Sequence, residues 1–113
     1  MRVDIPEIDV ATLAAHRADG SPLIDVREHD EFVTAHVPGA HHIPLGEVVE
    51  RIDEVTAQST VYVICAVGSR SAKAVAHYRQ QGIDAVNVAG GTQAWIAAGH
   101  PTHGGSSSES GGT

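Results

Sequence analysis

The sequence is short of cysteine, of aromatic residues and of positive charge. It contains one cysteine, Cys65, among 113 residues, so no disulfide can form within the chain. Aromatic residues make up 4% of the chain and hydrophobic residues 42%, which predicts a core of aliphatic side chains. A single thiol without a disulfide partner is typical of a reducing compartment, and we expect a cytoplasmic protein.

Basic residues are half as numerous as acidic ones, 7 against 14, and the net charge is -7 with histidine neutral. This charge disfavours nucleic acid and anionic membranes as partners. No stretch approaches the roughly 18 consecutive apolar residues of a membrane span, and the N-terminal residues lack the apolar segment of a signal peptide. Residues 70–79 hold three of the seven bases and no acid. That cluster indicates either a solvated helix surface or a positive entrance to a site for a small anion.

Helical and extended patterns alternate along the chain. Apolar residues at helical spacing predict helices, and short β-branched runs bounded by turn formers predict strands. The predicted helices cover residues 10–19, 28–36, 45–52, 72–81 and 93–98, and the predicted strands cover 22–26, 40–43, 61–64 and 85–88. Asp9 and Thr92 are the expected N-caps of the first and last helix. The alternation predicts one α/β domain with a mostly parallel sheet.

The composition changes at the C-terminal end. From residue 103 to residue 113 the chain consists of Gly, Ser and Thr apart from His103 and Glu109. Such a segment has too little apolar area to join a core, which predicts a disordered tail. We therefore expect a folded domain over residues 1–102 and a tail over residues 103–113.

Cys65 is the candidate functional residue, because it follows a buried strand and precedes a polar turn and a helix. Ligands of parallel sheets bind beyond the carboxyl ends of the strands, where Cys65 lies. Loop N–H groups and the positive end of a helix favour a thiolate there. Gly68 can adopt the positive φ that turns successive N–H groups toward one anion. The sequence predicts Cys65 as a nucleophile, held by a loop of six further residues: Ala66, Val67, Gly68, Ser69, Arg70 and Ser71.

Two groups of enzymes hold a cysteine in such a loop, one attacking phosphorus and the other sulfur. Cysteine-based phosphatases place five residues between the cysteine and an arginine, whereas four separate Cys65 from Arg70. One residue fewer shortens the loop by up to ~3.5 Å, which suits one extra sulfur atom better than a tetrahedral phosphoryl group. A phosphatase or an arsenate reductase is therefore the less favoured alternative.

Three segments resemble those of the rhodanese family, the thiosulfate-type sulfurtransferases. Residues 23–44 resemble its N-terminal signature, residues 65–71 its active-site loop and residues 90–101 its C-terminal signature. The segments occur in the family's order, and the chain resembles the single-domain form. The resemblance implies a rhodanese-like fold, with a central sheet of about five short strands and helices on both faces.

The resemblance also implies a sulfurtransferase that works through a persulfide on Cys65. A small anionic donor such as thiosulfate would supply the sulfur and release sulfite, and a thiol or cyanide would accept it. Arg70 would orient the donor, and neither a metal nor an organic cofactor is implied. The alternative is a persulfide carrier that exchanges sulfur with a protein donor or acceptor. The apolar residues Ala66 and Val67 favour this alternative, because they leave Arg70 as the one cation of the loop.

Other polar residues have structural interpretations. Asp25, Arg27 and Glu31 are expected to form a charge cluster that braces a turn. His41 and His42 are neighbours on a predicted strand, so their side chains point to opposite faces and make a poor metal chelate.

Overall fold

A parallel five-stranded sheet forms the centre of the molecule, with the strand order β1-β5-β4-β2-β3. The computed structural model describes residues 5–55 and 58–104. The strands are β1 (Glu7–Ile8), β2 (Leu23–Asp25), β3 (His41–His42), β4 (Val61–Ile64) and β5 (Ala85–Val88). β4 lies between β2 and β5, and all four of its residues are buried. The predicted α/β class and the parallel sheet are thereby confirmed.

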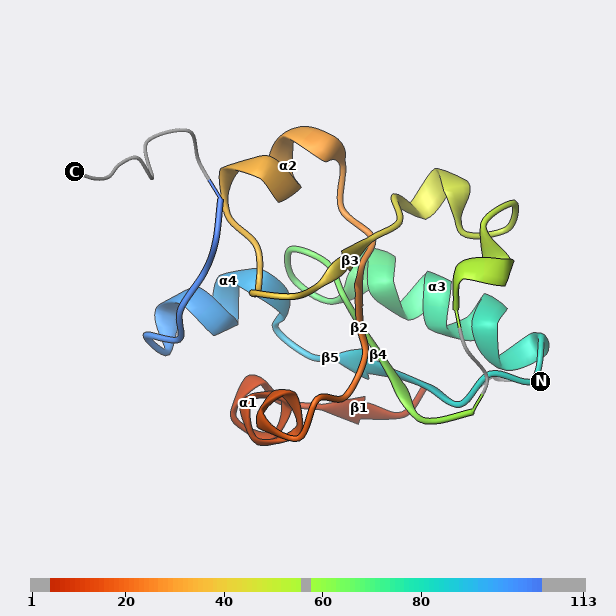
Figure 1. Cartoon of the computed structure of the whole chain (residues 1–113), viewed down its shortest axis with the longest axis horizontal. Coiled ribbons are helices and arrows are strands. Elements are labelled where there is room, and N and C mark those ends of the chain that lie inside the picture. Colours follow the sequence, from red (N-terminus) through yellow and green to blue (C-terminus); the bar gives the residue numbers. More distant parts are fainter. Residues whose placement is uncertain (1–4, 56–57, 105–113) are drawn as a thin grey trace.

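Helices cover both faces of the sheet (Figure 1). α1 (Val10–Ala18) and α4 (Gly91–Ala97) pack against one face, and α3 (Ser69–Gln80) packs against the other. The short α2 (His29–Thr34) follows β2. Because side chains of a strand alternate between faces, Tyr62 and Ile64 join the core beside α1 and α4. Val63 and Cys65 join the core beside α3, so the strand directs the cysteine toward that helix.

The helix predicted over residues 45–52 is wrong. Two short 3-10 helices stand in its place, η1 (Leu45–Glu47) and η2 (Ile52–Glu54). A 3-10 helix has three residues per turn and so aligns Leu45 with Val48, which is buried, while Val49 is 66% exposed. The spacing of the apolar residues is therefore compatible with both helix types. The segment is too short for α-helical hydrogen bonds to stabilise it as an α-helix.

Several predicted boundaries differ from the structure. α3 begins at Ser69, three residues earlier than predicted, so Ser69, Arg70 and Ser71 belong to its first turn. α4 is capped by Gly90, at φ 81°, rather than by Thr92, which lies inside the helix. The predicted N-cap of α1 is confirmed, since the Asp9 carboxylate accepts from the Thr12 N–H at 2.9 Å.

The structure includes part of the segment predicted as a tail. His103 exchanges backbone hydrogen bonds with His36 at 2.8 and 2.9 Å, and thus contacts the domain. Residues 105–113 lie outside the described residues, so their disorder stays a prediction. Among residues 5–55 and 58–104, no helix has the length and apolar character needed to cross a membrane.

Candidate functional site

The sulfur of Cys65 lies inside a ring of hydrogen-bond donors at the carboxyl end of β4. The residue itself is 0% exposed. Its Sγ accepts a hydrogen bond from the backbone N–H of Gly68 at 3.1 Å and one from the hydroxyl of Ser71 at 3.3 Å. The Cys65 loop, residues 65–71, therefore folds back around its own thiol, and the sulfur can carry negative charge in a buried position.

Gly68 adopts the conformation that the sequence predicted for it. Its φ is 110°, and it is the N-cap residue of α3. This left-handed conformation is strained for residues with a Cβ, and it lets the Gly68 N–H turn back toward Cys65. A Cβ at this position would lie 3.5 Å from the backbone nitrogen of Gly90, an ordinary contact distance. The backbone conformation, rather than a lack of space, accounts for glycine at this place.

Two opposing effects set the pKa of the Cys65 thiol. Burial raises it, because the interior disfavours the charged thiolate. Hydrogen bonds from the Ser71 hydroxyl and from the backbone N–H groups of Ser71, Gly68 and Val67 lower it. The hydrogen bonds outweigh burial, and the net pKa lies below the ordinary value of a cysteine. The thiolate, which is the nucleophilic form, is thus favoured.

Arg70 is not a free cation at the entrance of the loop. Its guanidinium forms two parallel hydrogen bonds to the carboxylate of Glu31 on α2, at 2.8 and 2.9 Å. The side-chain hydrogen bond from Arg70 lowers the pKa of Glu31 to about 2. Arg79 lies in the last turn of α3 and pairs with Asp84, which precedes β5. Of these bases, Arg70 is the one in the Cys65 loop, and Glu31 offsets its charge.

The N-terminal residues of α4 support the first half of the Cys65 loop. The N–H of Thr92 donates to the Cys65 carbonyl at 2.8 Å, and the N–H of Gln93 donates to the Ala66 carbonyl at 3.0 Å. Gly91 permits this approach, since a Cβ there would overlap both carbonyl groups. The loop is held from one side by α4 and from the other by α3.

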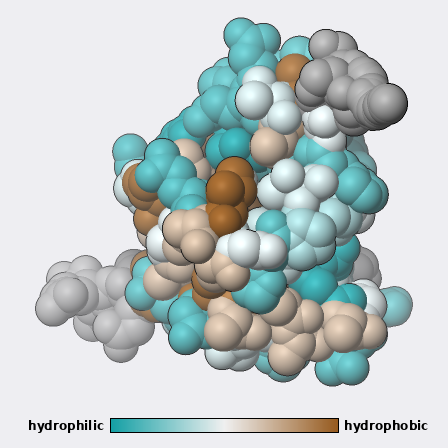
Figure 2. Space-filling model, turned by 90° about the vertical axis from the view of Figure 1, so that its left-hand side faces the viewer, coloured by the Kyte–Doolittle hydropathy of each residue, from teal (hydrophilic) through white to brown (hydrophobic). Residues whose placement is uncertain are grey.

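A cavity of about 440 Å³ opens beside the Cys65 loop. Ala66 of the loop, Gln93 and Ile96 of α4, and Glu31 of α2 contribute to its lining. Figure 2 views the side of the molecule where α2 and α4 lie in Figure 1, and it shows a strongly hydrophobic area near the centre, with mildly apolar surface below it and hydrophilic residues above. Val67 and Ile96 are 54% and 50% exposed. The loop thus has polar and apolar surface beside it.

The predicted charge cluster is only partly confirmed. Asp25 and Arg27 form a buried ion pair at 2.9 Å, and Arg27 also donates to the Ala35 carbonyl at 2.7 Å. Glu31 instead joins Arg70, as described above. The sequence suggested these charges as a group, but not the link between Glu31 and the Cys65 loop.

Asn87 is the site residue that the sequence analysis missed. It is fully buried on β5 and hydrogen bonds both Ser71 and Gly68. The available signal was a single amide within an otherwise apolar strand, because a buried polar side chain needs partners.

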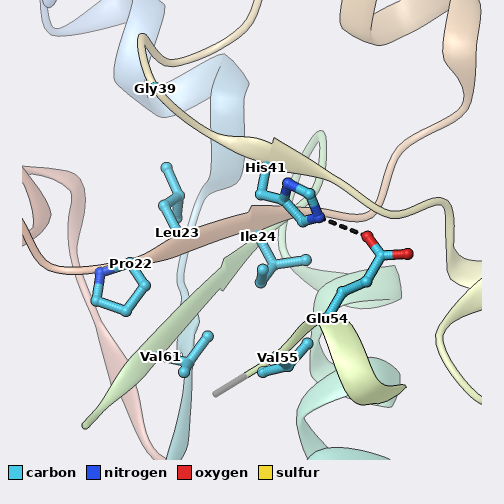
Figure 3. Close-up of a pocket in the computed structure, with 8 residues that line it drawn as sticks. All are labelled: Pro22, Leu23, Ile24, Gly39, His41, Glu54, Val55 and Val61. Carbon is cyan, nitrogen blue, oxygen red and sulfur yellow. Dashed lines mark hydrogen bonds and ion pairs between the residues drawn. The ribbon is translucent and has the colours of Figure 1, made fainter. Parts of the chain in front are cut away.

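The two adjacent histidines turn to different partners. His41 pairs with Glu54 at 2.7 Å, and the His42 Nε2 lies 2.7 Å from the Arg27 carbonyl. Figure 3 shows the His41–Glu54 pair beside a separate cavity of about 160 Å³. Its lining includes Pro22 and Val61, which lie at the amino ends of β2 and β4, opposite to Cys65. Within the described ranges, no three His, Cys, Asp or Glu side chains form a group that could hold a metal ion.

The structure is a parallel α/β domain that holds one hydrogen-bonded cysteine at the carboxyl end of its central strand, where ligands of such sheets bind. The sequence profile of the rhodanese-like domain matches residues 9–98, and the chain belongs to that family.

Relatives of the chain agree with this family. A candidate sulfur carrier protein of Bacillus subtilis, YrkF, is 43% identical over 74 residues, which are 65% of this chain and 40% of that protein. A candidate sulfurtransferase of the same organism, YtwF, is 36% identical over 95 residues, which are 82% of this chain and 92% of that protein. The crystal structure of a rhodanese-related protein from Thermoplasma volcanium is similar with a TM-score of 0.81 and 34% identity, and the match covers 87% of this chain and 97% of that one.

Proposed function

We propose that this protein is a sulfurtransferase that carries sulfane sulfur on Cys65. The observation that carries the proposal is the pair of hydrogen bonds from the Gly68 N–H and the Ser71 hydroxyl to the buried Sγ. These donors stabilise negative charge on sulfur, whether the group is a thiolate or a persulfide anion. The name of the relative YtwF supports sulfur transfer as the reaction class.

The proposed reaction has two steps. The Cys65 thiolate attacks the outer sulfur of thiosulfate, the S–S bond of the donor breaks, and sulfite leaves with the bonding electrons. Cys65 then carries a persulfide anion. An acceptor such as cyanide attacks the terminal sulfur and leaves as thiocyanate, and the Cys65 thiolate is regenerated. The chain needs no metal and no organic cofactor for either step, and the free thiol suits a reducing compartment.

The loop residues have separate roles in this proposal. Cys65 is the nucleophile, and Gly68 and Ser71 donate to its sulfur. The N–H groups of Val67 and Ser71 add to the same stabilisation. Arg70 holds α2 against the loop through Glu31 and orients an anionic donor only as part of that pair.

A persulfide carrier that serves a protein partner is the second candidate. The Arg70–Glu31 pair favours it, because the entrance then offers a small anion little net positive charge. The exposed side chains of Val67 and Ile96 add apolar surface for a partner. The name of the relative YrkF points in the same direction.

One assay tests the transferase and separates it from the carrier. The purified protein is incubated with thiosulfate and then with cyanide, and thiocyanate is measured together with the mass of the intact protein. A transferase forms thiocyanate over many turnovers, and Cys65→Ala abolishes the product. A carrier gains the mass of one sulfur on Cys65 from some donor but turns over thiosulfate poorly. Neither product nor added sulfur with any donor would reject both candidates.

A further inference from the structure

Asn87 connects the Cys65 loop with the first strand of the sheet. Its Oδ1 accepts from the Ser71 hydroxyl at 2.5 Å, and its Nδ2 donates to the Glu7 carboxylate at 2.9 Å and to the Gly68 carbonyl at 3.0 Å. Carboxylates and carbonyls only accept hydrogen bonds, so the amide nitrogen must face Glu7 and Gly68. The amide oxygen must therefore face Ser71, and the side chain has one orientation.

Two of these three partners also contact the sulfur. Ser71 lies 3.3 Å from Sγ through its hydroxyl oxygen, and Gly68 lies 3.1 Å from Sγ through its backbone nitrogen. The Gly68 carbonyl additionally accepts from the Ala72 N–H at the start of α3. Asn87 is thus linked to the sulfur through Ser71 and through Gly68, and it does not contact the sulfur itself.

The route through Ser71 contains a competition. A serine hydroxyl has one proton to donate, and here two acceptors lie within reach, Cys65 Sγ and Asn87 Oδ1. While the sulfur is a neutral thiol, its S–H can donate to the Ser71 oxygen, and the Ser71 proton stays with Asn87. Once the sulfur is an anion, the hydroxyl turns toward it, because hydrogen bonds to charged acceptors are the stronger ones. The Asn87 oxygen then loses its buried donor, which costs free energy.

We propose that Asn87 is a positioning residue that competes with Cys65 for the single proton of Ser71. The hydroxyl donates to the sulfur when the sulfur is an anion and to Asn87 when the sulfur is neutral. The proposal deepens the proposed function, since the anionic forms in question are the thiolate and the persulfide of the transfer cycle. It predicts a coupling between positions 71 and 87 that can be measured without any sulfur transfer.

The charged groups on the neighbouring elements must be held constant in a test. They are Glu7 on β1, Arg70 on α3 with its partner Glu31 on α2, and Asp25 at the end of β2 with its partner Arg27. A double-mutant cycle of Ser71→Ala and Asn87→Ala replaces none of these charged residues. Asn87→Ala removes the donor to Glu7 and to the Gly68 carbonyl, but that loss is the same with and without Ser71 and therefore cancels from the coupling.

The experiment measures the ionisation of Cys65 in four proteins: wild type, Ser71→Ala, Asn87→Ala and the double variant. Because Cys65 is the only cysteine of the chain, the rate of iodoacetamide alkylation against pH reports on it alone. Thiolate absorbance in the ultraviolet gives the same constant without a reagent that must reach the buried sulfur. Circular dichroism confirms folding, and Asn87→Val replaces Asn87→Ala in the cycle if the alanine variant does not fold.

The expected result has a definite sign. Removing Asn87 should favour the thiolate more when Ser71 is present than when it is absent, by about threefold or more in the ionisation constant. A control cycle pairs Asn87→Ala with Ser69→Ala, since Ser69 is an exposed serine of the same loop, and that pair should be additive. Additivity of positions 71 and 87, or coupling of the opposite sign, would overturn the proposal. If the wild-type protein instead forms no thiocyanate, the proposed function is rejected, and the coupling between positions 71 and 87 is unaffected.

Discussion

The guanidinium of Arg70 and the carboxylate of Glu31 form a two-point ion pair across 39 residues of sequence, at 2.8 and 2.9 Å. The pair joins the first turn of α3, which is part of the Cys65 loop, to α2. Glu31 also accepts from the Glu28 N–H in the capping box of α2. One carboxylate therefore orders α2 and offsets the charge of the loop's only cation.

Neutralising Glu31 should improve the binding of an anionic donor. Glu31→Gln keeps an oxygen that accepts from Arg70 and removes the negative charge, so Arg70 regains a net positive field. We expect the KM for thiosulfate to fall by about threefold, with kcat unchanged, because ion pairs near the protein surface carry roughly 1 kcal/mol or less. The gain should shrink at high salt.

The matched control for this variant is Glu50→Gln. It removes the same charge from an exposed position in the turn between η1 and η2. The KM for thiosulfate should then stay close to that of the wild type. An equal fall in both variants would assign the effect to net charge, and a rise in Glu31→Gln would show that Glu31 itself assists donor binding.

The same ion pair should make stability depend on pH. The pKa of Glu31 is about 2 in the folded protein, below its ordinary value of 4.5, because Arg70 hydrogen bonds its charged form. The pair therefore stabilises the folded state above about pH 4.5, and this contribution is lost as the pH falls toward about 2. Between about pH 6 and pH 3, the urea midpoint of the wild type should fall further than that of Glu31→Gln. Parallel losses in the two proteins would contradict this role.

Gly68→Ala should affect both folding and the thiol. Alanine at φ 110° is strained by about 1–2 kcal/mol, and relief of the strain would turn the N–H of residue 68 away from Sγ. We expect a stability loss of that size, a raised pKa of Cys65 and slower transfer. Urea unfolding and the alkylation rate against pH measure the first two.

Gly20→Ala is the control for Gly68→Ala, because it introduces backbone strain at a glycine outside the Cys65 loop. Gly20 also has a positive φ, 83°, and a Cβ there would meet nothing within 4 Å. It should lose a similar amount of stability while the titration of Cys65 stays unchanged. An unchanged thiol pKa in Gly68→Ala as well would mean that the Gly68 N–H does not support the thiolate.

The sequence was most informative where local pattern and burial coincide. β4 and β5 occupy the predicted residues, 61–64 and 85–88, because short runs rich in β-branched residues and bounded by turn formers favour inner strands. The positive φ of Gly68 followed from the need to turn a loop around Cys65. The pattern of residues 45–52 failed, since the spacing of Leu45 and Val48 suits a 3-10 turn as well as an α-helix.

The tertiary contacts of the site could not be read from the sequence. Glu31 and Arg70 meet only because the chain brings α2 beside the start of α3, and no local pattern encodes that approach. β1 was missed because it has two residues, yet its Glu7 is a partner of Asn87. The polar residues of this site come together only once the sheet has assembled. The periodicity of the sequence predicts the apolar core alone.

The buried pair of Asp25 and Arg27 should be sensitive to the loss of one partner. Asp25 is 0% exposed and accepts from the Arg27 side chain and backbone N–H, at 2.9 to 3.2 Å. Asp25→Ala leaves a buried guanidinium without its anion, and we expect a loss of about 3–5 kcal/mol in the free energy of unfolding. The direct measurement is urea unfolding of the purified variant.

A second substitution distinguishes the cost of an unpaired charge from the loss of packing. Arg27→Met, added to Asp25→Ala, removes the stranded charge but keeps an apolar side chain of similar length. The double variant should be more stable than Asp25→Ala alone, although the Ala35 carbonyl loses its donor from Arg27. A double variant of lower stability would mean that Arg27 contributes more through Ala35 than through Asp25. Because Arg27 also lines the cavity beside Ala66, thiosulfate turnover in the same variants shows how far the pair supports the sulfur site.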